Sequence, residues 1–325
     1  MIIGVDVSKA TLDIFIKPVG INLTIENKQV GFKKFIKQLS DCCENDCDIL
    51  VVMEHTGKYS FRFEHFLRSQ GIGYCKLPAL EIKKSLGMVR GKNDQVDARR
   101  IAEYGWLRKD ILLADRFPQE IILKLRQYIG LRAKLVKDRA GYMARLKEDL
   151  YTGSFEKNDR GSKLQRDIIK YLTVQIEKIE SEIKELICQN EDIKKNYELL
   201  ISIKGVGEII AVFMIACTDN FIKFKNARKF NCYAGLAPFK NESGTSKRGK
   251  AKVSSLACRQ AKTLLDRAAC CALQHDHEIK NYYQRKIAEG KAKRSCINAI
   301  KSKIVARIFA VVKRQTPFVE MSNAA

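Results

Sequence analysis

Two aspartates, Asp94 and Asp97, stand three positions apart within a basic segment that runs from Lys92 to Arg100. On a helix, residues i and i+3 share one face, so both carboxylates would point the same way. Like charges on one face repel, and the pair therefore requires a cation beside it. Lys92, Arg99 and Arg100 could supply that charge. The alternative is a divalent metal ion, because Mg²⁺ is held by one or two carboxylates together with substrate phosphates.

Two further acids lie in apolar runs that have the character of buried strands. Asp6 interrupts the run MIIGVDVS at residues 1–8, and Glu54 ends the run DILVVME at residues 48–54. Continuous apolar strands predict a sheet that is buried on both faces. A carboxylate on such a strand is costly unless a positive charge or a metal ion neutralises it.

Asp6, Glu54, Asp94 and Asp97 therefore form a candidate cluster of four carboxylates. Two metal ions about 4 Å apart in such a cluster would suit in-line attack on a phosphodiester. The alternative is that the many neighbouring lysines and arginines neutralise the acids in a purely structural role. We interpret the four positions as catalytic and metal-binding, with Mg²⁺ as the expected ion and Mn²⁺ as a possible substitute.

The charge of the chain points to a polyanionic partner. Sixty Lys and Arg residues against 37 Asp and Glu residues give a formal net charge of +23. This charge favours nucleic acid, without distinguishing DNA from RNA or a binding protein from an enzyme. No apolar stretch approaches the roughly 18 residues of a membrane-spanning helix, and the first residues lack a signal-peptide pattern. Eleven scattered cysteines without a Cys-x-x-Cys motif favour reduced thiols, so we expect a cytoplasmic protein without a membrane partner.

Strands and helices alternate in the pattern up to about residue 115, which predicts a mixed α/β sheet with helices packed on it. We expect a first domain at 1–115, a helical hairpin at 116–197 and a C-terminal, mainly helical domain at 198–325. The expected strands lie at 1–8, 11–17, 21–26, 48–54 and 71–77, and the expected helices at 30–39, 59–69 and 94–107.

The middle region has the spacing of a coiled coil. A Lys- and Arg-rich helix is expected at 118–150, and a second helix carries apolar residues at steps of three and four: Ile169, Leu172, Ile176, Ile179, Ile183 and Leu186. Ile193 continues this seam, which would place Asn190 at a core position. Two helices with a short break predict an antiparallel hairpin, which would serve dimerisation, nucleic-acid binding or only spacing.

The last region carries two features that suit contact with a phosphate backbone. Gly205 and Gly207 stand between helical segments and resemble a helix-hairpin-helix turn, whose backbone N–H groups can hold a phosphate. Residues 239–250 are hydroxyl-rich and cationic, which predicts a flexible loop that includes Lys247 and Arg248. Helices are expected on either side of an intervening segment, at 254–274 and 295–315.

Five motifs in this order resemble transposases of the insertion-sequence 110 family, which are described as bridge-RNA-guided recombinases. The motifs are GVDVSK at 4–9, EHTGKY at 54–59, KNDQVDAR at 92–99, IKGVG at 203–207, and AGLAP at 234–238 followed by ESGTS at 242–246. The resemblance runs nearly end to end. It implies an RNase H-like N-terminal domain, similar to Holliday-junction resolvases (RuvC-like).

The resemblance also implies roles for individual residues. The family's four acids correspond to Asp6, Glu54, Asp94 and Asp97, and its C-terminal serine corresponds to Ser243, the expected nucleophile of a phosphoserine intermediate. Thr245 and Ser246 are neighbouring hydroxyls, and only the motif register favours Ser243. We expect contacts to nucleic acid from Lys92, Arg99, Gly205, Gly207, Lys247 and Arg248.

The partners that the resemblance implies are double-stranded DNA, a structured non-coding guide RNA and further copies of the chain, as a dimer or tetramer on the nucleoid. Each active site would be shared, with four acids from one subunit and the serine from another. Two alternatives stay open at this point. One is a site-specific DNA invertase of the Piv type, and the other is an RNase H-like protein that only cleaves or only binds nucleic acid.

Overall fold

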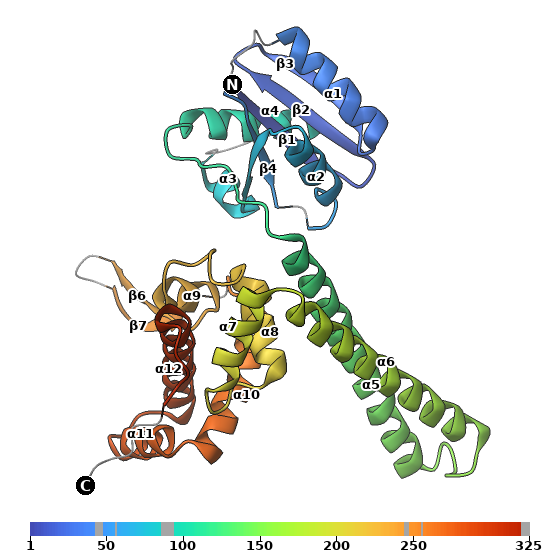
Figure 1. The fold of residues 1–325 in the computed structure, drawn as a ribbon, viewed down its shortest axis with the longest axis vertical. Helices are drawn as coiled ribbons and strands as arrows, with labels where there is room; N and C mark the ends of the chain where they lie inside the picture. Colours follow the sequence, from blue (N-terminus) through green and yellow to red (C-terminus); the bar gives the residue numbers. More distant parts are fainter. Residues whose placement is uncertain (43–47, 56, 86–93, 244–246, 255, 320–325) are drawn as a thin grey trace. The chain divides into compact units, whose positions relative to one another are not determined.

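The computed structural model describes residues 1–42, 48–55, 57–85, 94–243, 247–254 and 256–319, without the side chains of 240–243, 247, 248 and 250–252. The chain divides into two compact units, Met1–Phe117 and Pro118–Ala325 (Figure 1). Within the described residues, no helix has both the length and the apolar character needed to cross a bilayer.

The first unit is built on a five-stranded mixed sheet with the order β3-β2-β1-β4-β5. β1, β2 and β3 are antiparallel neighbours, whereas β4 and β5 run parallel to β1. The strands are β1 (Ile2–Val7), β2 (Thr11–Lys17), β3 (Ile21–Glu26), β4 (Leu50–Glu54) and β5 (Gly73–Leu77). The expectation of a mixed α/β sheet is confirmed, and the last strand begins two residues later than predicted.

Helices cover both faces of this sheet. One face packs its alternate residues, such as Ile3 and Val5, against α1 (Gln29–Cys42) and α2 (Phe61–Ser69) in one apolar cluster. The other face packs Ile2 and Phe15 against α4 (Asp94–Leu107). The sequence analysis missed α3 (Ala79–Ser85), a short helix directly after β5. Burial on both faces explains why β1 and β4 are nearly continuous apolar runs.

Glycines allow α4 to lie directly on the central strands. A Cβ atom on Gly4 of β1 would lie 2.2 Å from the Ala98 carbonyl oxygen and 2.3 Å from the Ala102 nitrogen. A Cβ atom on Gly105 of α4 would lie 2.9 Å from side-chain atoms of both Ile2 and Val52. These distances are shorter than real contacts, so helix and strand can approach this closely only without the side chains.

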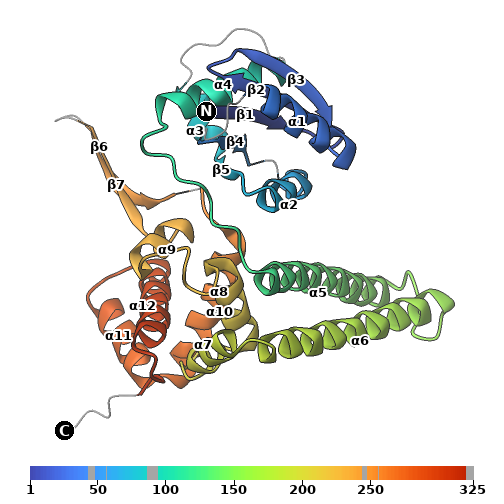
Figure 2. The ribbon, with the colours of Figure 1, turned by 45° about the horizontal axis from the view of Figure 1, so that its top comes forward.

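The second unit contains the predicted helical hairpin. α5 (Glu120–Thr152) and α6 (Arg160–Cys188) lie side by side and are joined by a short break (Figure 2). Arg132 pairs with Glu180 across the hairpin at 2.7 Å. Four residues of the predicted seam are buried: Leu172, Ile176, Ile183 and Leu186.

The predicted place of Asn190 in that seam is wrong. α6 ends at Cys188, and Asn190 instead caps α7 (Glu191–Ile201), where its side chain accepts a hydrogen bond from the Ile193 nitrogen at 3.0 Å. Asn competes for backbone groups and is favoured at helix starts, which explains the break. Ile193 is fully buried in the apolar core of the second unit.

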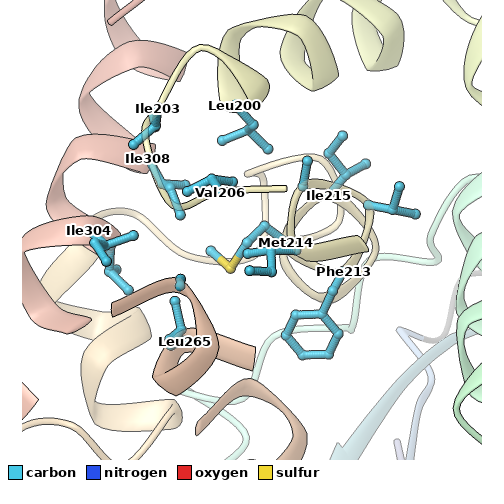
Figure 3. Packing of buried hydrophobic residues seen from close by; sticks show 14 of the residues in the cluster. Leu200, Ile203, Val206, Phe213, Met214, Ile215, Leu265, Ile304 and Ile308 are labelled. Atoms are coloured by element: carbon cyan, nitrogen blue, oxygen red, sulfur yellow. The ribbon is translucent and has the colours of Figure 1, made fainter. Parts of the chain in front are cut away.

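The remaining helices pack around one apolar core. Leu200, Met214, Leu265 and Ile304 meet there from four different helices (Figure 3). The helices that surround this core are α7, α8 (Glu208–Thr218), α9 (Ala227–Tyr233), α10 (Arg259–His275), α11 (His277–Ala288) and α12 (Lys293–Arg314). Residues of α5 and α6 belong to the same core. The separation that we expect between residues 197 and 198 stays a prediction.

The flexible loop predicted for 239–250 is wrong over its described part. Residues 238–243 and 247–253 form an antiparallel hairpin, β6 (Pro238–Ser243) and β7 (Lys247–Val253), with an irregular register between Phe239 and Asn241. Glycine, serine and lysine are common in loops, and that composition concealed the backbone pairing.

We predict that Gly4→Ala lowers the free energy of unfolding of the first unit by about 2 kcal/mol or more, because overpacking against a helix backbone cannot relax easily. Denaturant unfolding followed by Trp106 fluorescence measures this, since Trp106 is the single tryptophan and lies on α4. Gly141→Ala is the control, because a Cβ atom there meets nothing within 4 Å. An unchanged transition for Gly4→Ala would show that α4 does not need this close contact.

Candidate active site of four carboxylates

Asp6 and Glu54 lie side by side at the carboxyl ends of two neighbouring strands. β1 and β4 are parallel neighbours in which Gly4 is paired with Val52 and Val5 with Met53, so the next alternate residues are Asp6 and Glu54. Side chains alternate between faces along a strand. Asp6 therefore shares the face of Gly4, and Glu54 shares the face of Val52, which is the face covered by α4.

Asp94 and Asp97 occupy the first turn of α4, as the spacing predicted. The N-terminal end of a helix favours negative charge, which partly offsets the repulsion between them. Asp97 also accepts a hydrogen bond from Arg100, with Nη1 and Oδ1 2.9 Å apart. The first alternative is therefore partly met, because one arginine pairs with Asp97, whereas the metal ion stays a prediction.

The four acids act on one another electrostatically. The pKa of Asp6 is raised from 3.8 to about 6, first by burial and then by the charges of Asp94, Asp97 and Glu54. The backbone hydrogen bond with Val7 acts in the opposite direction. Burial is thus the larger cause of the raised pKa, and the neighbouring carboxylates add to it.

The chemistry of this donor set fits a divalent cation, since hard cations take carboxylate oxygens as ligands. In the described part of the chain, however, no group of three or more Asp, Glu, His or Cys side chains already converges on one point. Ion binding thus requires side-chain rotation, including release of Asp97 from Arg100. The charges of the acids influence one another, but their side chains are not yet arranged as the ligands of one ion.

A fifth acid, Asp13, escaped the sequence analysis. It stands directly opposite Asp6 in the β1–β2 ladder, so both side chains lie on one face about 5 Å apart at Cβ. Asp13 is 7% exposed and accepts a hydrogen bond from the Thr24 hydroxyl at 2.6 Å. The sequence signal was the short turn between two neighbouring antiparallel strands, whose register places Asp13 opposite Asp6.

The Arg99 side chain pairs with Glu103 and with none of the four candidate acids. Its Nε lies 3.1 Å from Glu103 Oε1, and its guanidinium lies 5.7 Å from the centre of the Phe15 ring. Lys92 lies outside the described residues. The predicted contact of Arg99 with nucleic acid therefore requires that it leave Glu103, a bond that is exposed and weak.

Ser243 belongs to the second unit, whereas the four acids belong to the first. It is the last residue of β6, and its backbone is paired with Lys247 at the start of β7. Arg248 is paired with Glu242 in the same ladder. The structure therefore brings Ser243, Lys247 and Arg248 together on the described ends of one hairpin.

The two glycines of the predicted phosphate-binding turn have different surroundings. Gly205 has a φ of +89°, and a Cβ atom on it would lie 2.6 Å from the Ala268 carbonyl oxygen of α10. Packing and backbone conformation therefore account for this glycine. Gly207 precedes α8 and has open space around it, but Glu208 in the first turn of α8 pairs with Lys184 at 2.9 Å.

Two sequence models of known families match the chain. One, described as "Transposase IS116/IS110/IS902 family", matches residues 197–284. The other, described as "Transposase" and of the IS110 DEDD type, matches residues 3–152. The mixed five-stranded sheet fits the RNase H-like domain of such DEDD transposases.

Curated relatives agree with these matches. The pilin gene-inverting proteins of Moraxella bovis and Moraxella lacunata are each 25% identical over 97% of this chain and 97% of their own length. An uncharacterised 44.8 kDa protein of insertion element IS116 from Streptomyces clavuligerus is 23% identical over 75% of this chain and 77% of its own length. The chain therefore belongs to the IS110 family of transposases and is an enzyme of DNA recombination.

Proposed function

We propose that this transposase cuts and rejoins DNA strands at the four-carboxylate site, with Ser243 as the nucleophile and a structured RNA as the guide. The observation that carries the proposal is the raised pKa of Asp6, about 6, which is caused first by burial and then by the charges of Asp94, Asp97 and Glu54. Like charges that lie close together in this way suit a site where a cation and a phosphate are bound.

DEDD transposases generally use divalent metal ions. We propose Mg²⁺ for this chain, with Asp6, Glu54, Asp94 and Asp97 as its ligands, and Mn²⁺ as a substitute of similar ligand preference. When bound, such ions polarise a phosphoryl oxygen and stabilise the charge on the attacking and leaving oxygens. Asp13 would support this arrangement by holding its charge beside Asp6, fixed by Thr24.

The covalent step exchanges one phosphate ester for another. The Ser243 hydroxyl loses its proton, its Oγ forms a bond to the scissile phosphorus, and the bond to the deoxyribose oxygen breaks. The leaving oxygen takes up a proton, and the strand stays attached as a phosphoserine. Attack by another DNA hydroxyl on the phosphoserine reverses these changes and joins the new strand pair.

We propose that the acids and the serine of one site come from different subunits of a dimer or tetramer. The motif resemblance supports this arrangement, and so does the location of the acids and Ser243 on separate compact units. The charge of +23 suits double-stranded DNA and a guide RNA, bound together on the nucleoid. Lys247 and Arg248, next to Ser243 in the hairpin, would contact the DNA backbone.

A second candidate activity is inversion of a resident DNA segment. The Moraxella pilin gene-inverting proteins match almost the whole chain, and this coverage favours the candidate. Inversion and transposition use the same cutting and joining chemistry and differ in which DNA ends are joined. A protein that only cleaves or only binds nucleic acid would form no phosphoserine, which separates it from both.

We predict that Ser243→Ala abolishes the covalent protein–DNA adduct while DNA binding stays within about two-fold of wild type. The adduct is measured by denaturing electrophoresis after reaction with labelled DNA that carries the flanks of the gene and RNA transcribed from them. Thr245→Ala and Ser246→Ala are the matched controls and should retain the adduct. An undiminished adduct in Ser243→Ala would remove this serine from the mechanism.

We predict that Asp97→Asn lowers Mg²⁺-dependent strand cleavage by about 100-fold or more, since it removes a ligand from the site. Asp110→Asn removes the same charge from an exposed position of the first unit and should leave cleavage unchanged. Cleavage is measured on the same labelled DNA. Full cleavage by Asp97→Asn would place the metal site elsewhere.

The raised pKa of Asp6 also predicts a pH-dependent stability. The folded state binds more protons than the unfolded state between about pH 4 and pH 6, so the stability of the metal-free protein rises as the pH falls through this window. Asp6→Asn removes this dependence. We expect it to be about 2 kcal/mol more stable than wild type at pH 8, less than the full shift gives because solvent screens the half-buried Asp6, with the difference vanishing near pH 4.

Unfolding followed by Trp106 fluorescence measures that difference in the first unit. Millimolar MgCl₂ at pH 8 should stabilise the wild type and leave Asp6→Asn unaffected, because ligand binding to the folded state adds stability. A variant that is less stable than wild type at pH 8 without metal would contradict the like-charge cluster.

A further inference from the structure

A hollow of about 620 Å³ lies between α1 and α2 in the first unit, lined by Lys28, Gln29, Phe32, Phe61, Arg62 and His65. These helices cover the sheet face opposite to the face that carries Asp6. The hollow is therefore separate from the carboxylate site. Its volume falls in the range of about 300–1,000 Å³ that is usual for sites of small ligands.

Aromatic rings form a row beside this hollow. His65 lies between two phenylalanines, with ring centres 4.5 Å from Phe61 and 4.7 Å from Phe117, and both contacts are edge-to-face. The Arg68 guanidinium covers the far ring, 4.4 Å from the centre of Phe117. His65 is exposed and Phe61 is half-buried, so rings of this row are accessible to a ligand.

The charge of the hollow is positive. Arg62 is exposed and forms no ion pair with any described carboxylate, and Lys28 has only a long, solvent-exposed contact with Glu26 at 3.7 Å. The nearby Glu64 is buried and is already bound by Lys76 at 2.8 Å and by the Ser60 hydroxyl at 2.6 Å. Arg62 therefore faces no described carboxylate as an ion-pair partner, and the exposed Glu26 is the acid that an anion at Lys28 would have to displace.

Rings with cations beside them are the combination that binds unpaired nucleotides, because every base has a face that stacks and every nucleotide carries a phosphate. Bases in a duplex are already stacked and cannot enter a hollow, whereas bases in RNA loops are free to do so. Gln29 adds an amide at the rim that can both donate to and accept from a base edge or a ribose hydroxyl.

We infer that the hollow between α1 and α2 binds an unpaired nucleotide of a structured RNA, with the base against Phe61 and His65 and the phosphate against Arg62 and Lys28. This inference rests on the proposed guide RNA and names a place where that RNA is held. It assigns the two faces of the sheet to two nucleic acids, DNA at the acids and RNA at the hollow.

A buried side chain joins the segments that follow the two strands carrying Asp6 and Glu54. The Asn27 amide nitrogen donates to the carbonyl oxygens of Ser8 and Tyr59, at 3.0 Å each. Ser8 follows Asp6 by two residues, and Tyr59 lies in the segment between Glu54 and α2. A nucleotide next to Lys28 and Phe61 would thus lie directly beside the segments that leave both catalytic strands.

The test measures binding to three fluorescent probes, an oligoadenylate RNA, its deoxy counterpart and a DNA duplex of the same length. We expect His65→Ala and Phe61→Ala each to raise the Kd for the RNA roughly five-fold or more, as expected for loss of one stacked base. Duplex affinity should change by less than about two-fold. Because His65 is exposed, we expect His65→Ala to fold normally. The test therefore stays valid even if Phe61→Ala is poorly folded.

Arg62→Gln tests the phosphate contact against a matched control. The slope of log Kd for the RNA against log salt should fall by about 0.7, the value for one lost phosphate contact on a single strand. Lys37→Gln removes the same charge from an exposed position of α1 outside the hollow and should leave the slope unchanged.

Three results would overturn the inference: RNA affinity that is unchanged in all three variants, equal losses for RNA and duplex, or tighter binding of the deoxy strand than of the RNA. These binding measurements need no metal ion and no cleavage. Loss of the proposed cleavage chemistry in its own tests therefore leaves the inference intact, and failure here leaves the carboxylate site intact.

Discussion

The close contact between α4 and β1 is the constraint on which the site depends. Gly4 lets the helix backbone approach the strand until no Cβ atom would fit, and this brings Asp94 and Asp97 toward Asp6 and Glu54. Four carboxylates then repel one another in a partly buried place, which raises the pKa of Asp6 to about 6. The folded state tolerates this repulsion because apolar packing elsewhere in the unit stabilises the sheet.

That packing is concentrated on the other face of the sheet. Phe32, Phe35 and Phe63 are fully buried there, with Phe32 and Phe63 5.3 Å apart between ring centres. Apolar burial of this extent stabilises by several kcal/mol. The same face forms the hollow next to α2, so the layer that tolerates the acidic cluster also offers a cationic and aromatic surface. Under the two proposals, one domain would bind a metal–phosphate centre on one face of the sheet and a second nucleic acid on the other.

Local patterns predicted the first unit well and the second unit less well. The apolar runs ending near Asp6 and Glu54, and the i, i+3 spacing of Asp94 and Asp97, depend on neighbouring residues, and the structure brings those four acids together. Asp13 required the pairing of β1 with β2, which is a property of two strands and not of either run alone.

The β6–β7 hairpin shows the same limit. Its backbone pairing is invisible in a sequence of lysines, glycines and serines, and composition pointed to a loop. Asn190 fits the heptad spacing but is also a preferred N-cap, and the local hydrogen bond to the Ile193 nitrogen decided the outcome. The proposed partnership of Ser243 with the acids would combine residues of two compact units, and no periodicity within either unit could predict it.

The central claim is that Asp6, Glu54, Asp94 and Asp97 together hold a divalent ion. The most direct measurement is anomalous X-ray diffraction from crystals grown with Mn²⁺, which locates the ion independently of activity. The account predicts an anomalous peak bound by carboxylates of these four residues, with Asp97 released from Arg100. A peak at another place, or none while Asp97 stays paired with Arg100, would contradict it.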